Sequence, residues 1–95
     1  MHFCKINVTK PRKVEWKQVK EILGNMFWIY GHDTALHKKY PIRISVYPQT
    51  LYFKFSYSNA EEYKDLLHIA LKWIELLGKL NCRIRYVNIS ENGGE

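Results

Sequence analysis

Residues 42–56 read IRISVYPQTLYFKFS, and this stretch decides the fold. Apolar and polar side chains alternate on both sides of Pro48 and Gln49, which is typical of two strands that are each buried on one face. The short connection between them predicts an antiparallel hairpin. Such a hairpin presents one apolar face, against which the rest of the chain has to pack.

Two more strands and two helices are expected around this hairpin. Residues 2–8 and 82–89 alternate like strands, whereas residues 9–24 and 59–78 place apolar side chains at helical spacing and end at a glycine. Thr9, followed by Pro11, predicts the start of the first helix, and Ser58 or Asn59 predicts the cap of the second. Residues 26–30 fit either a short strand or a further helical turn, and residues 34–40 show no clear pattern.

This order of elements predicts a ferredoxin-like two-layer α+β sandwich, β-α-[β]-β-β-α-β, with two helices on one face of an antiparallel sheet. We expect a single domain over residues 1–90 and a flexible polar tail over residues 91–95. The first and last strands are antiparallel neighbours in this plan, so Cys4 and Cys82 should lie near opposite ends of them. Both cysteines are therefore predicted to be free thiols.

The charge of the chain is concentrated in its first half. The formal net charge is +6, and ten of the fifteen Lys and Arg residues lie in residues 1–57 beside only three acidic residues. A basic excess of this kind favours partners that carry phosphate groups.

The strand alternation predicts that basic and aromatic side chains share the sheet face opposite the helices. Aromatic rings there can stack on bases while Lys and Arg contact phosphates, as a platform for single-stranded nucleic acid requires. The arrangement is similar in kind to that of RNA-recognition-motif proteins, although residues 51–55 lack the glycine of their signature. The alternatives are the ordinary polar outer face of a half-exposed sheet and a dimer that packs sheet against sheet. The predicted nucleic-acid-binding residues are Lys5, Arg43, Tyr47, Tyr52, Lys54, Arg83 and Arg85.

Two other surfaces are candidates. Lys10, Lys13, Lys17 and Lys20 recur at helical spacing and predict a basic stripe on the first helix, which is either a solvated face or a phosphate contact. Ile69, Trp73 and Leu76 lie beside the core stripe of the second helix and need a cover. Either residues 26–40 fold over them, or a second copy of the chain binds there and forms a homodimer.

No catalytic, cofactor or metal motif is present, because the four histidines are scattered and no glycine-rich phosphate loop occurs. The absence of a secretory signal and of a long apolar run predicts a cytoplasmic protein that does not enter a membrane. Abundant Lys, Asn, Ile, Tyr and Phe fit an A+T-rich gene of viral or mobile-element origin.

The sequence therefore predicts a small basic binding protein that is not an enzyme. No cofactor is expected and no small-molecule substrate is indicated, and the first expected partner is single-stranded nucleic acid. The alternative is a homodimeric assembly or regulatory module that uses the apolar second helix.

Overall fold

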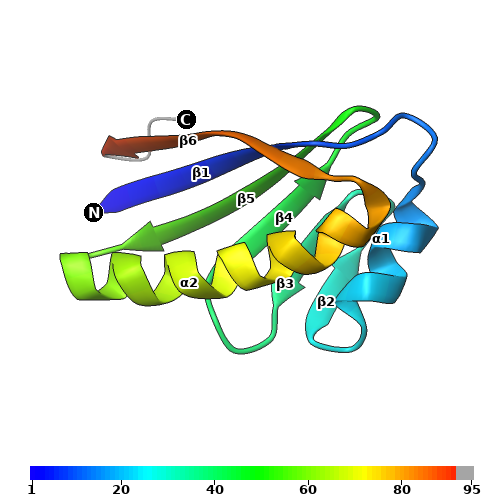
Figure 1. Cartoon of the computed structure of the whole chain (residues 1–95). Coiled ribbons are helices and arrows are strands. Elements are labelled where there is room, and N and C mark those ends of the chain that lie inside the picture. Colours follow the sequence, from blue (N-terminus) through cyan, green and yellow to red (C-terminus); the bar gives the residue numbers. More distant parts are fainter. Residues whose placement is uncertain (92–95) are drawn as a thin grey trace.

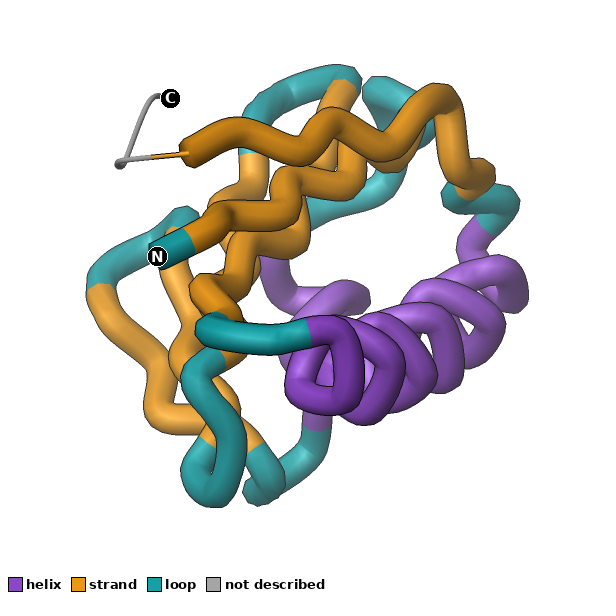
Figure 2. The backbone as a smooth tube through the Cα atoms, turned by 90° about the vertical axis from the view of Figure 1, so that its left-hand side faces the viewer, coloured by secondary structure: helices purple, strands orange, loops and turns teal. Residues whose placement is uncertain are grey.

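Antiparallel strands form one sheet, and two helices cover one of its faces (Figure 1). The computed structural model describes residues 1–91. The strands are β1 (His2–Thr9), β2 (Phe27–Tyr30), β3 (Thr34–His37), β4 (Ile42–Val46), β5 (Thr50–Tyr57) and β6 (Arg83–Glu91). The helices are α1 (Trp16–Leu23) and α2 (Ala60–Leu77), and a 3₁₀ turn, η1 (Gly78–Leu80), follows α2. Figure 2 shows the strands as one layer with the helices on one side.

The predicted ferredoxin-like plan is wrong. Across residues 1–91 the sheet has six strands in the order β2-β3-β4-β5-β1-β6, whereas the plan has four and one optional short strand. After α1 the chain forms an antiparallel meander, β2 to β5, before α2 begins. The supported description is a small α+β fold with an antiparallel sheet and two helices. Glu91, expected in the tail, belongs to β6, and residues 92–95 of that predicted tail lie outside the described residues.

The relation between the first and last strands is as predicted. β1 pairs antiparallel with β6 on one side and with β5 on the other. Cys4 is opposite Ile89, whereas Cys82 lies just before the other end of β6. Both cysteines are buried and free, which confirms the prediction of two thiols.

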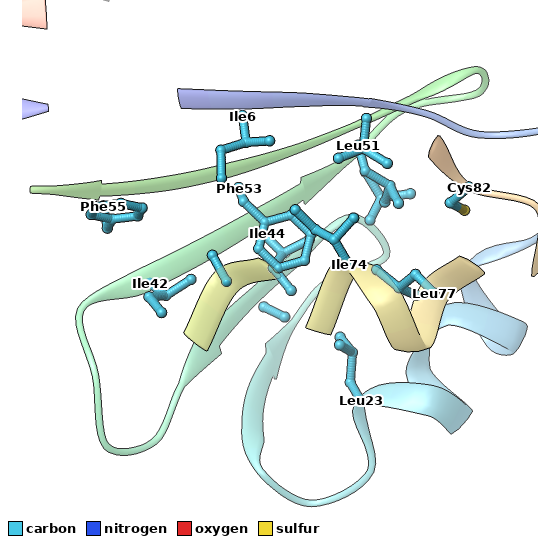
Figure 3. Close-up of a cluster of buried hydrophobic side chains, with 14 of the residues drawn as sticks. Ile6, Leu23, Ile42, Ile44, Leu51, Phe53, Phe55, Ile74, Leu77 and Cys82 are labelled. Atoms are coloured by element: carbon cyan, nitrogen blue, oxygen red, sulfur yellow. The ribbon is translucent and has the colours of Figure 1, made fainter. Parts of the chain in front are cut away.

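The core lies between the sheet and the helices. The hairpin of β4 and β5 supplies its centre, because the inward residues Ile44 and Phe53 are directly opposite each other and are fully buried. Figure 3 shows these two side chains beside Ile74 from α2, with Leu23 from α1 at the lower edge of the cluster. The alternation of residues 42–56 thus identified the inner face of both strands correctly.

Helix α1 begins later than predicted. Thr9 is still part of β1, where its hydroxyl donates to the carbonyl oxygen of Arg83 (3.1 Å), so it does not cap a helix. The helix begins at Trp16, and the side chain of Gln18 accepts a hydrogen bond from the N–H of Glu15 (2.9 Å). Gly24 ends the helix as predicted, with a φ of 61° that glycine adopts without strain.

Helix α2 begins at its predicted cap. The side chain of Asn59 accepts a hydrogen bond from the N–H of Glu62 (2.9 Å), and the Glu62 carboxylate accepts one from the N–H of Ser58 (2.7 Å). These reciprocal contacts satisfy backbone donors that a helix start leaves free. Leu71 of this helix is 38% exposed.

Strands β2 and β3 pack against Trp73 in the second apolar stripe of α2. The rings of Phe27 and Trp73 meet edge to face, with their centroids 5.1 Å apart, and the ring of His37 lies 6.3 Å from Trp73. Ile69, Trp73 and Leu76 are all half-buried. Of the two expected covers, residues 26–40 provide the one seen at Trp73. A dimer through this stripe stays a prediction. Because the three residues are half-buried, they offer less apolar surface to a second copy than fully exposed residues would.

The buried His37 should make the fold sensitive to acid. Its Nδ1 accepts hydrogen bonds from the N–H groups of Lys39 (3.0 Å) and Tyr40 (3.3 Å), which requires the neutral ring. Burial, and secondarily the charge of Lys39, lower the pKa of His37 from its ordinary value of 6.5. As the pH falls below about 6.5, the unfolded chain binds a proton that the folded protein resists, so the free energy of unfolding decreases.

We expect urea denaturation to give a lower free energy of unfolding at about pH 5.5 than at about pH 7.5. His37→Gln should reduce this difference, because the group that resists protonation is gone. His32→Gln, which changes an exposed histidine, is the matched control and should leave the difference unchanged. Equal pH dependence in the wild type and His37→Gln would contradict the assignment.

Candidate functional site

The sheet face that the helices leave open carries a row of three cations on adjacent strands. Lys54 on β5 is directly opposite Lys5 on β1 and Arg43 on β4. Neighbouring strands are about 4.8 Å apart, and like charges placed opposite each other destabilise a sheet. Within residues 1–91, the strand positions that share this face with the row include no acidic residue. The row, which we call the cationic row, therefore attracts anions.

A hollow of about 260 Å³ lies over the cationic row. All three of its cations line the hollow, together with Phe3, Ser56 and Asn88. Asn88 is the β6 residue opposite Lys5, so it extends the row onto the edge strand. The hollow thus combines positive charge with short polar and with apolar side chains, which suits a ligand that carries an anionic group.

Aromatic rings flank the cationic row. The ammonium group of Lys5 lies 4.2 Å from the ring centroid of Tyr52, and the ring of Tyr47 meets that of Tyr52 edge to face at 5.5 Å. Tyr47 is 52% exposed, so much of its ring is open to a ligand. A second cation and ring pair, Lys38 over Trp28 at 4.5 Å, lies toward the other edge of the sheet. The fold therefore brings together five of the seven predicted residues: Lys5, Arg43, Tyr47, Tyr52 and Lys54.

A buried amide lies beside these rings. Asn7 is 3% exposed, between Tyr52 and Tyr86 in the sheet, and its Nδ2 donates to the Tyr86 hydroxyl (3.3 Å). The Oδ1 of Asn7 has no hydrogen-bond partner in the described part of the chain. An unpaired buried acceptor of this kind costs about 1 to 3 kcal/mol.

Arg83 and Arg85 do not join the cationic row. Asn7 pairs with Tyr86 but Val8 pairs with Ile84, so Arg85 is an extra residue at a bulge. The guanidinium of Arg83 donates to the carbonyl oxygens of Cys82 (3.2 Å) and Gly78 (3.5 Å) beside the end of α2. Strict alternation along residues 82–89 predicts that Tyr86 faces inward. Because the bulge shifts the alternation, Tyr86 faces outward instead.

The predicted lysine stripe on the first helix is interrupted. Lys10 is 6% exposed, and its Nζ donates to the carbonyl oxygens of Pro11 and Val14. Burial lowers the pKa of this lysine. Lys13 lies before the helix, and only Lys17 and Lys20 are on α1. The exposed members of the stripe are thus Lys13, Lys17 and Lys20.

Metal ligands are not grouped in the part of the chain that the structure describes. Over residues 1–91, no three His, Cys, Asp or Glu side chains are grouped as they would be around a metal ion. Burial raises the pKa of the Cys4 thiol to about 11, so this group stays protonated at neutral pH. Neither α1 nor α2 has the length and apolar character of a membrane-spanning helix.

These features define a small α+β protein whose antiparallel sheet is open on one face and carries the cationic row. No protein family, curated protein or solved structure matches the chain.

Proposed function

We propose that the open sheet face binds single-stranded nucleic acid. Lys5, Arg43 and Lys54 contact phosphates, and Tyr47 and Tyr52 stack on bases. The observation that supports this most directly is the cationic row, in which three like charges face each other across adjacent strands, with no acid at the described strand positions of that face. A phosphate backbone supplies the negative charge that the sheet itself lacks there.

The rings favour a single strand over a duplex. A duplex offers mainly phosphates to a flat surface, whereas an unpaired strand also offers the faces of its bases. The half-exposed ring of Tyr47 lies against Tyr52, which in turn lies under Lys5, so stacking and phosphate contact occur at adjacent positions. The Oδ1 of Asn7 is an unused acceptor for a base amino group if Tyr86 turns aside.

Fluorescence anisotropy with labelled DNA and RNA single strands, titrated over a salt series, tests the proposal. Each phosphate contact on a single strand contributes about 0.7 to the slope of log K against log salt. The triple variant Lys5→Gln, Arg43→Gln, Lys54→Gln should therefore reduce that slope by about two and weaken binding at low salt.

The matched control is Lys13→Gln, Lys17→Gln, Lys20→Gln, which removes the same charge from the helix side of the molecule. It should keep the salt slope of the wild type, because only the general field is reduced. No binding by the wild type at low salt would overturn the proposal. So would loss of slope in the helix-side variant alone, since the lysine stripe would then be the contact surface.

A further inference from the structure

The edge strand β6 is long and has a free side. It pairs with β1, and the strand order ends with it, so no strand within residues 1–91 covers its outer side. β6 has nine residues, whereas β2 at the opposite edge has four. An open edge of this length is a template for pairing with another strand unless charges, prolines or irregularities block it. The bulge at Arg85 protects only the first part of β6.

The side of β6 that faces the helix layer is apolar and exposed. Ile84 and Val87 are each 44% exposed and Ile89 is 51% exposed, although their partners Val8, Ile6 and Cys4 on β1 are fully buried. Leu71 of α2 is 38% exposed and lines, with Ile84, a hollow of about 350 Å³ beside the start of the strand. An apolar strip that follows a free sheet edge is typical of a surface that another protein segment covers.

The charges along β6 indicate which segment fits. Arg83 and Arg85 make its first end positive, and Glu91 makes its last described position negative. When two identical strands pair antiparallel, the first end of each strand lies beside the last end of its partner. The strand is therefore complementary in charge to a second copy of itself, whereas a parallel copy would place like charges together.

We propose that β6 pairs antiparallel with β6 of a second copy, about a twofold axis at Asn88. This register places Arg85 of each copy opposite Glu91 of the other and Val87 opposite Ile89. Val87 and Ile89 of both copies then cover one another on the helix side of the sheet. The two sheets become one continuous sheet, and the free edge disappears.

This dimer also joins the two cationic rows, a consequence that rests on the proposed function. Lys5 is opposite Asn88 in its own copy, so an Asn88 pair on the axis aligns Arg43, Lys54 and Lys5 of both copies along one line. The line crosses eight adjacent strands, four from each copy. With about 4.8 Å between neighbouring strands, it spans about 34 Å. A longer single strand would then contact both rows.

Sedimentation velocity without nucleic acid tests the dimer, so its failure is distinct from failure of the binding proposal. The wild type should show a dimer mass that dissociates on dilution within about 1 to 100 µM, the range expected of a small interface. Arg85→Glu and Glu91→Arg should each weaken dimerisation about tenfold, because each places like charges together twice. The double variant Arg85→Glu, Glu91→Arg should restore it, since the pairs are re-formed with reversed sign.

A second pair of variants tests the apolar strip. Ile89→Lys should give a monomer, whereas Ile29→Lys, which changes an exposed apolar residue on the opposite edge strand, should leave the mass unchanged. Circular dichroism should show that both variants are folded. A wild type that is monomeric at the highest concentration overturns the proposal. A double charge reversal that is as weak as the single ones, or dissociation by Ile29→Lys alone, also overturns it.

Discussion

Replacing Phe53 by alanine should reduce the free energy of unfolding by about 3 to 5 kcal/mol, which is the usual cost of truncating a buried phenylalanine. Phe53 is fully buried at the centre of β5, opposite Ile44 and close to Ile74 of α2 (Figure 3). Removing its ring leaves a cavity between the sheet and the helix layer. A domain of this size is stable by only about 5 to 15 kcal/mol, so the loss is a large part of the total.

Urea denaturation monitored by tryptophan fluorescence and circular dichroism measures this loss. Tyr30→Ala is the matched control, because it truncates an aromatic ring that is 52% exposed on a strand of the same sheet. The control should cost less than about 1 kcal/mol, as is usual for exposed positions. Similar losses in the two variants would contradict the central place of Phe53 in the core.

The inner face of the sheet was predictable from the sequence because strand alternation is strict wherever one face is buried. Cys4, Ile6 and Val8, and the inward residues of the hairpin, all lie in the core as their spacing indicates. Of the two additional strands, β2 was one of two alternatives for residues 26–30, whereas β3 had no signal in the sequence. β2 and β3 have four residues each, and they form because Phe27 and His37 pack on Trp73, a contact distant in sequence.

The candidate site was predictable where its residues lie on regular strands, because strand alternation identifies the face of each side chain. Lys5, Arg43 and Lys54 lie on regular strands, so their spacing identified their face and the register brought them into one row. Arg85 was misplaced because it is the extra residue of a bulge, and a bulge leaves no periodic signal. Arg83 keeps its predicted parity opposite Thr9, but its guanidinium binds the carbonyl oxygens of Cys82 and Gly78. Lys10 was taken for a helix residue because nothing in its neighbours indicated that its ammonium group would bind carbonyl oxygens in a turn.

Lys54→Glu should separate stability from binding. Lys54 is exposed and lies between Lys5 and Arg43, so a glutamate there replaces two like-charge neighbours by two opposite-charge pairs. Cross-strand charge pairs are each worth roughly 0.2 to 1 kcal/mol. The variant should therefore be more stable than the wild type by about 0.5 to 1 kcal/mol at low salt, and the gain should shrink as salt is added.

The same substitution should abolish binding of a single strand at the cationic row. It places a negative charge where a phosphate would lie and pairs the two remaining cations within the protein. Urea denaturation and anisotropy on one preparation measure both effects, and Lys54→Gln should give an intermediate result in each. If the sheet face is only a solvated polar surface, Lys54→Glu should still increase stability, but neither the wild type nor the variant should bind a single strand. Unchanged binding by Lys54→Glu would therefore remove the cationic row from the proposed site, whereas opposite changes in stability and affinity would mean that the row is kept for a ligand at the expense of the fold.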